Sequence, residues 1–142
     1  RNMERLQLKW QTARQLVPKA EIVGRGGPVG VLYFGTTSLP IPEALDKLAV
    51  KGIHLDTCRV RAFPFGDEVE AFVAEHDLIF VVEQNRDAQM RTLLINELQT
   101  NPAKLISILY FAGLSISADF IDAQISAYYE EHKLARLTEV KS

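Results

Sequence analysis

The sequence has a single cysteine, Cys58, among its 142 residues. One cysteine excludes an internal disulfide, and it excludes a zinc or iron–sulfur site made from the cysteines of this chain alone. The sequence also lacks a phosphate-binding P-loop, a Cys-x-x-Cys pair and a His-Glu-x-x-His motif. We therefore expect no metal ligands, no catalytic residues and no redox or carbon–carbon chemistry from this chain by itself.

No excess of positive charge and no long apolar run are present. The chain carries 16 Lys and Arg against 18 Asp and Glu, a net charge of -2, and 47% of its residues are hydrophobic. This balance gives no basic surface for nucleic acid or for an anionic membrane, and no stretch is long enough for a membrane span or resembles a secretory signal. With Arg1 as its first residue, the sequence predicts a cytoplasmic fragment of a longer protein that folds as one domain.

The first thirty residues predict a helix and a linker. Over residues 1–17, Met3, Leu6, Trp10, Ala13 and Val17 fall on one stripe of an amphipathic helix. We expect Trp10 to be a packing anchor, and an undocked helix would expose this stripe and favour a homodimer. Residues 18–30 hold four glycines and two prolines, which predicts a linker before an α/β domain at 31–142. The glycines precede a strand, whereas a nucleotide-binding loop follows one.

From residue 31 onward, short apolar runs alternate with helical patterns. The runs predict strands at 31–34, 55–60, 78–82 and 105–111, and the intervening patterns predict helices at 43–51, 68–75, 86–99 and 118–134. Alternation of this kind is typical of an α/β fold with a mainly parallel sheet covered by helices on both faces. Ligand and partner contacts then gather in the loops after the strands.

The loop after the first predicted strand contains small polar residues. Gly35, Thr36, Thr37 and Ser38 precede a predicted helix that begins near Pro40 or Pro42. Free backbone amides at such a helix start could hold a phosphate or a carboxylate. Capping of the helix by Thr37 or Ser38 accounts for the same composition.

The third predicted strand ends in a dense polar cluster over residues 83–89. A carboxylate in an apolar strand is costly to bury, so Glu83 should find a cation or backbone donors, or lie at a hydrated interface. Asn85 or Asp87 could cap the next helix, and Gln89 shares a face with Asn85 and Arg86. The cluster is therefore either a capped helix start or a contact patch formed by Glu83, Asn85, Arg86 and Gln89.

The histidines and the last loop give no catalytic pattern. Residues 113–117 resemble the nucleophile elbow of a hydrolase, but Ser117 stands where the closing glycine belongs. His132 lies in a charged run that predicts a solvated helix end, and we expect Ser117 to cap the last helix with Asp119 in its first turn. His54 and His76 have no partner at helical spacing for a metal site.

Four motifs together resemble the C-terminal domain of the alpha subunit of 2-oxoacid:ferredoxin oxidoreductases, which is related to the C-terminal domain of transketolase. They are Leu32-Tyr33-Phe34-Gly35-Thr36-Thr37, Arg61-Ala62-Phe63-Pro64-Phe65, Val81-Val82-Glu83-Gln84-Asn85 with Gln89, and Phe111-Ala112-Gly113 through Ile116 and Ala118. The segment Arg1-Asn2-Met3 with Arg5 and Lys9-Trp10 is similar to the lead into that domain. Ser115 departs from the family, which often has proline there.

The resemblance implies a three-layer α/β/α sandwich with about five strands, one of them antiparallel. It implies an enzyme that uses thiamine diphosphate, Mg²⁺ and an iron–sulfur cluster, passes electrons to ferredoxin and forms an acyl-CoA from coenzyme A. In such enzymes this domain contacts the remaining alpha-subunit domains and a beta subunit and binds no cofactor itself. The sequence of residues 83–89 is most similar to that of the 2-oxoglutarate branch of the family.

Two alternatives stay open on the sequence alone. One is a stand-alone α/β module that binds an anion or a nucleotide at residues 35–38. The other is the equivalent domain of transketolase or of a 2-oxoacid dehydrogenase beta subunit.

Overall fold

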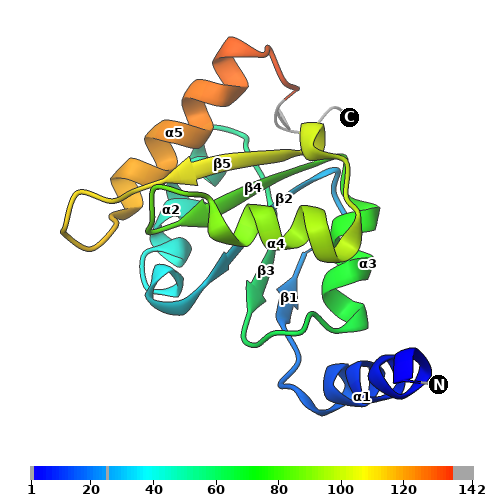
Figure 1. Ribbon diagram of the computed structural model, residues 1–142. Helices are drawn as coiled ribbons and strands as arrows, with labels where there is room; N and C mark the ends of the chain where they lie inside the picture. The colour runs from blue at the N-terminus through cyan, green and yellow to red at the C-terminus, as the bar shows by residue number, and fades with distance from the viewer. Residues whose placement is uncertain (1, 25, 136–142) are drawn as a thin grey trace.

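The structure is a computed structural model that describes residues 2–24 and 26–135 (Figure 1). Its strands are β1 (Glu21–Val23), β2 (Val29–Phe34), β3 (Asp56–Val60), β4 (Leu78–Glu83) and β5 (Leu105–Leu109). Its helices are α1 (Asn2–Leu16), α2 (Ile41–Val50), α3 (Asp67–Glu75), α4 (Gln89–Leu98) and α5 (Ala118–Glu131), with single 3-10 turns η1 (Gly35–Ser38) and η2 (Pro102–Lys104).

The strands form one sheet in the order β1-β3-β2-β4-β5. Strands β3, β2, β4 and β5 run parallel, and β1 pairs with β3 in the antiparallel direction. Helices α2 and α5 cover one face of the sheet, and α3 and α4 cover the other (Figure 1). The predicted three-layer α/β/α sandwich with a mainly parallel, five-stranded sheet is confirmed.

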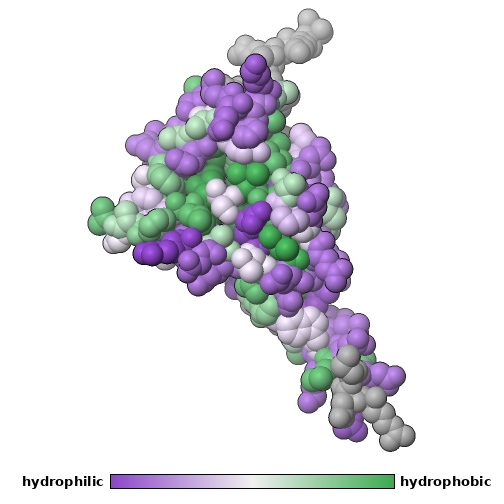
Figure 2. Space-filling model, turned by 45° about the horizontal axis from the view of Figure 1, so that its top comes forward, coloured by the Kyte–Doolittle hydropathy of each residue, from purple (hydrophilic) through white to green (hydrophobic). Residues whose placement is uncertain are grey.

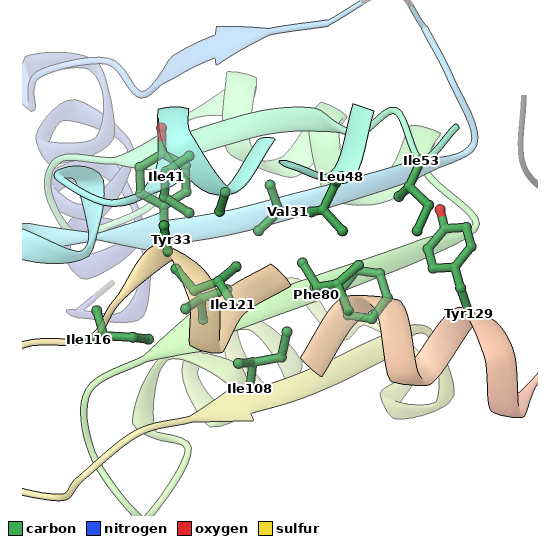
Figure 3. Packing of buried hydrophobic residues seen from close by; sticks show 14 residues of the cluster. Val31, Tyr33, Ile41, Leu48, Ile53, Phe80, Ile108, Ile116, Ile121 and Tyr129 are labelled. Atoms are coloured by element: carbon green, nitrogen blue, oxygen red, sulfur yellow. The ribbon is translucent and has the colours of Figure 1, made fainter. Parts of the chain in front are cut away.

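The alternation of side chains along the strands produces the two cores. Val31 of β2 and Phe80 of β4 point toward α2 and α5, where they meet Leu48 and Ile121 (Figure 3). Leu32, one residue further along β2, points toward the core under α3 and α4. Burial of each large apolar side chain contributes about 1.5–3 kcal/mol, so both faces of the central strands are needed for stability.

The predicted linker at 18–30 differs from the structure, because it contains the antiparallel edge strand β1 and the start of β2. Ile22 of β1 lies opposite Cys58 of β3. Gly30 serves close packing: a Cβ there would lie 2.6 Å from Cζ of Phe72 on α3. Three residues of strand between glycines and prolines are too short for apolar periodicity to reveal.

The last two helices are shorter than predicted. Helix α4 begins at Gln89 instead of residue 86, because Ala88 adopts the left-handed conformation with φ of 51°. Helix α5 ends at Glu131 instead of residue 134, before Lys133 with φ of 50°. Strand β5 ends at Leu109, two residues earlier than predicted.

Helix α1 projects from the domain and is fastened mainly at its C-terminal end (Figure 1). Arg14 donates from Nε to the carbonyl oxygen of Phe65 at 2.6 Å and pairs through Nη2 with Asp67 and Glu70 at 3.0 and 3.1 Å. Trp10 meets the ring of Phe63 edge to face, with 5.6 Å between centroids, yet it remains 44% exposed. The predicted apolar stripe therefore packs on the domain only in part.

Candidate functional site: the carboxyl edge of the sheet

The order in which strands are added to the sheet reverses between β2 and β4. The chain goes from β2 to its neighbour β3 on one side and then crosses to β4 on the other side. In open α/β sheets the crevice outside the carboxyl ends of two such strands is the usual ligand position. The two loops predicted as candidate sites, 35–38 and 83–89, both begin at this point.

Gln84 joins the two loops. Its Nε2 donates to the hydroxyl oxygens of Thr36 and Thr37, both at 3.0 Å. Thr37 is buried, so its hydroxyl is directed into the protein. The side chains of Thr36, Thr37 and Gln84 between β2 and β4 are thus bonded to each other.

The helix after this loop is not capped by either predicted residue. The N-cap of α2 is Pro40, and no side chain caps it, so the prediction of capping by Thr37 or Ser38 is wrong. Gly35 has φ of 62°, and Gly35–Ser38 forms a single 3-10 turn. This turn uses the hydroxyls for contact with Gln84, which a residue-by-residue capping rule does not consider.

Glu83 is fully buried at the end of β4 and is satisfied by the start of α4. Its Oε1 accepts from the backbone N–H of Met90 at 2.7 Å and from Nδ2 of Asn85 at 2.9 Å, and its Oε2 accepts from the backbone N–H of Arg91 at 3.0 Å. The predicted backbone donors for Glu83 are confirmed. The N-terminal amides of α4, a natural anion site, are therefore occupied by a carboxylate of the same chain.

Asn85 shapes the turn that brings this carboxylate to the helix. Its Oδ1 accepts from the backbone N–H of Asp87 at 3.1 Å and of Gln89 at 3.4 Å. The N-cap position belongs to Ala88, so neither Asn85 nor Asp87 is the N-cap residue, although Asn85 accepts from the first N–H of α4 as a capping side chain would. A lone acidic residue ending an apolar strand just before a helix was the available signal for capping by Glu83.

Arg86 and Gln89 remain at the surface. The guanidinium carbon of Arg86 lies 5.4 Å from the ring centroid of Phe111, in the loop after β5. Phe111 is 60% exposed, and Leu114 in the same loop is 75% exposed. Leu39 and Phe63, which follow β2 and β3, are exposed as well. All four apolar side chains lie in loops at the carboxyl edge, and the sequence did not indicate them as contact residues.

The loop before α5 is structural. Ser117 accepts from the backbone N–H of Phe120 at 3.1 Å, which confirms it as the cap of α5, with Asp119 in the first turn. His132 is exposed at the other end of this 14-residue helix, roughly 21 Å away. The residues of the apparent nucleophile elbow therefore do not meet a histidine from this helix.

A second buried polar pair lies at the amino end of the sheet. His76 has Nδ1 2.7 Å from the carbonyl oxygen of Phe72 and Nε2 2.8 Å from Oδ2 of Asp56. A carbonyl oxygen only accepts, so Nδ1 donates to Phe72, and Nε2 lies within hydrogen-bond distance of the Asp56 carboxylate. The pair borders a hollow of about 490 Å³ between β1 and α3. The sequence did not indicate this pair, because Asp56 and His76 are 20 residues apart and meet only in the fold.

Within the described residues there is no group of three His, Cys, Asp or Glu side chains placed to hold a metal ion. Cys58 is buried in β3, and burial raises the pKa of its thiol to about 12. A thiol with so high a pKa is a poor nucleophile and a poor metal ligand at neutral pH. Over residues 2–24 and 26–135, no helix is long and apolar enough to cross a membrane.

The strand order and the helices on both faces define a doubly wound α/β domain. No family model and no curated protein matches the chain. Among solved structures it is similar to 2-oxoglutarate:ferredoxin oxidoreductase from Magnetococcus marinus, with 2-oxoglutarate, coenzyme A and succinyl-CoA bound. The identity is 21% and the TM-score 0.70, over 82% of this chain and 20% of that chain.

A second similar structure is the alpha chain of a probable 2-oxoacid ferredoxin oxidoreductase from Thermoplasma acidophilum. Here the identity is 22% and the TM-score 0.50, over 79% of this chain and 97% of that chain. Both structural neighbours are 2-oxoacid:ferredoxin oxidoreductases, the family that the sequence motifs resemble. At these identities the likeness shows the fold, and the chain spans about a fifth of the Magnetococcus protein chain.

Proposed function

We propose that this chain is the C-terminal contact domain of the alpha subunit of a 2-oxoacid:ferredoxin oxidoreductase, with 2-oxoglutarate as the favoured substrate. The observation that carries the proposal is the carboxyl edge of the sheet. Internal hydrogen bonds hold the side chains of Glu83 and Gln84, while four large apolar side chains are exposed in the loops of this edge. An edge of this kind suits protein contact better than ligand binding.

The described residues do not fit the cofactors of such an enzyme. Thiamine diphosphate would need free backbone amides or cations for its phosphates, and the amides at the start of α4 already bind Glu83. An iron–sulfur cluster needs several thiolates, and the chain has only the buried Cys58. Thiamine diphosphate, Mg²⁺, the cluster and coenzyme A would then belong to other domains and to the beta subunit, with ferredoxin as the electron acceptor.

The geometry does not favour a stand-alone anion-binding module. Such a module would use residues 35–38, but the Thr36 and Thr37 hydroxyls are held by Gln84. The equivalent domain of transketolase or of a dehydrogenase beta subunit would share this fold, and the two ferredoxin-dependent neighbours favour the first assignment.

The test uses the complete alpha and beta subunits read from the gene that encodes this chain. Leu114→Ser should weaken subunit assembly at least tenfold in analytical ultracentrifugation and lower ferredoxin reduction with 2-oxoglutarate and coenzyme A in proportion. Val50→Ser is the matched control, because Val50 is 88% exposed at the opposite edge of the sheet. Equal assembly of both variants, or no activity with any 2-oxoacid, would contradict the proposal.

A separate variant tests the polar cluster. Asn85→Ala should weaken assembly of the full enzyme more than it lowers the melting temperature of the chain. Unchanged assembly would remove Asn85 from the contact surface.

A further inference from the structure

Strand β5 forms one edge of the sheet and is paired along one side only. It pairs in parallel with β4, from Leu105 opposite Ile79 to Leu109 opposite Glu83. Among residues 2–24 and 26–135, no strand pairs with its other side. Figure 2 brings the top of Figure 1, where β5 lies, toward the viewer and shows hydrophobic atoms gathered in the middle of this face between hydrophilic borders.

The two edges of the sheet differ in how they are protected. Edge strand β1 has three residues, all exposed, and its Glu21 pairs with Arg59 at 3.3 Å. Strand β5 has the sequence Leu-Ile-Ser-Ile-Leu, with no charge, proline or glycine. Natural edge strands usually carry such residues to prevent pairing with another chain, so their absence from β5 points to a partner strand.

The hydrogen bonds fix which backbone groups of β5 face outward. The N–H of Tyr110 donates to the carbonyl oxygen of Glu83 in β4 at 3.0 Å. Because successive residues of a strand direct their N–H and C=O groups to opposite sides, Ile106 and Ile108 also face β4. Leu105, Ser107 and Leu109 then direct their backbone groups away from β4, where the carbonyl oxygen of Leu105 accepts from Nε of Arg91 at 2.9 Å.

The sequence of this edge reads the same in both directions around Ser107. We propose that β5 pairs in the antiparallel direction with β5 of a second copy of this chain, about a twofold axis through Ser107. Ser107 then faces Ser107, Leu105 faces Leu109, and Ile106 faces Ile108 of the other copy. The outward groups match in this register. Because Arg91 already holds the Leu105 carbonyl oxygen of each copy, about four backbone hydrogen bonds join the two five-stranded sheets into one.

Two exposed apolar side chains, Phe111 and Leu93, lie near β5 in the sequence or on the helix before it. Phe111, two residues after the end of β5, is 60% exposed. Leu93 on α4 is exposed and lies on the helix that covers this side of the sheet. These apolar side chains extend the contact beyond the strand.

The available area is that of a modest dimer. A five-residue strand is about 17 Å long, and a helix, a sheet and a helix stack to roughly 30 Å, which gives about 500 Å² on each copy. The total of about 1,000 Å² lies near the lower limit for a specific interface. We therefore expect a dissociation constant in the micromolar range.

The test reverses charge at the twofold axis. Ser107 is exposed, so Ser107→Lys and Ser107→Glu should each leave the melting temperature of the monomer nearly unchanged. Like charges directly opposite each other are destabilising, so each variant alone should dimerise at least tenfold more weakly than the wild type in sedimentation equilibrium. A mixture of the two, with one labelled by ¹⁵N, should form a heterodimer in native mass spectrometry.

Two controls complete the design. Ser115→Lys changes an exposed serine in the loop after β5 and should not affect the dimer. Trp10→Ala tests a dimer formed through the exposed face of α1 and should also have no effect. A wild-type chain that stays monomeric at about 1 mM, a dimer that survives both Ser107 variants, or a mixture that forms no heterodimer would overturn the proposal.

Discussion

Two buried carboxylates, Glu83 at the carboxyl edge of the sheet and Asp56 at its amino edge, are stabilised in different ways. Glu83 accepts from two backbone amides and one side-chain amide, all of which are fixed donors. Asp56 lies 2.8 Å from Nε2 of His76, and an imidazole nitrogen can act as a hydrogen-bond donor or acceptor. The first arrangement closes a ligand position with the protein's own charge, and the second joins β3 to the end of α3.

The largest expected effect concerns Glu83. Glu83→Ala leaves the amides of Met90 and Arg91 without an acceptor and should lower the free energy of unfolding by about 3 kcal/mol in urea denaturation. Glu83→Gln should cost nearly as much, because both carboxylate oxygens accept and an amide NH₂ would face an N–H donor. Exposed Glu97 on the same helix is the control, and an equal loss from Glu97→Ala would contradict this account.

The corresponding changes at Asp56 should behave differently. Asp56→Ala removes the partner of Nε2 of buried His76 and should cost about 2 kcal/mol. Asp56→Asn should recover more than half of that loss, because its amide can donate to Nε2 of a neutral imidazole. The comparison between the two sites fails if the amide variants rescue Glu83 and Asp56 equally in denaturation experiments.

The next largest loss in the free energy of unfolding is expected for Gln84. Gln84→Ala removes both hydrogen bonds to Thr36 and Thr37 and should lower the free energy of unfolding by about 1 kcal/mol. Amide resonances of Gly35–Ser38 should shift in NMR spectra, while Gln89→Ala, at an exposed side chain of the same loop, should leave them in place. Unshifted resonances in the Gln84 variant would show that the crevice is closed by other contacts.

The smallest effect at neutral pH concerns the buried thiol of Cys58. Burial raises the pKa of Cys58 to about 12, so the unfolded chain releases this proton at lower pH than the folded one. The stability contribution is complete below about pH 9 and is lost as the pH rises toward 12. Cys58→Val should flatten that alkaline decline, and the native thiol should resist iodoacetamide at pH 8; rapid alkylation of the folded chain would refute the assignment.

The fold was largely predictable because long apolar runs and helical periods dominate residues 31–135. Strand β1 was not, since its three residues, Glu21–Val23, pair with β3 through backbone bonds and carry no alternating pattern of burial. The closure of the candidate site was only half predictable. The cost of burying Glu83 implied donors, but the left-handed Ala88 that lets α4 supply them leaves no clear signal in sequence.

Contacts between segments far apart in the sequence could not be predicted either. The pairing of Asp56 with His76 and of Gln84 with Thr36 depends on which strands lie side by side. Sequence order alone does not specify that arrangement.

The central claim is that the carboxyl edge is closed to ligands and serves protein contact. The most direct measurement is NMR of the ¹⁵N-labelled chain titrated with thiamine diphosphate and Mg²⁺, coenzyme A and inorganic phosphate, each to about 1 mM. The account predicts no saturable shift at the amides of Thr37, Gln84 and Met90. Saturable shifts at these amides with any of the three would show an open ligand site and contradict it.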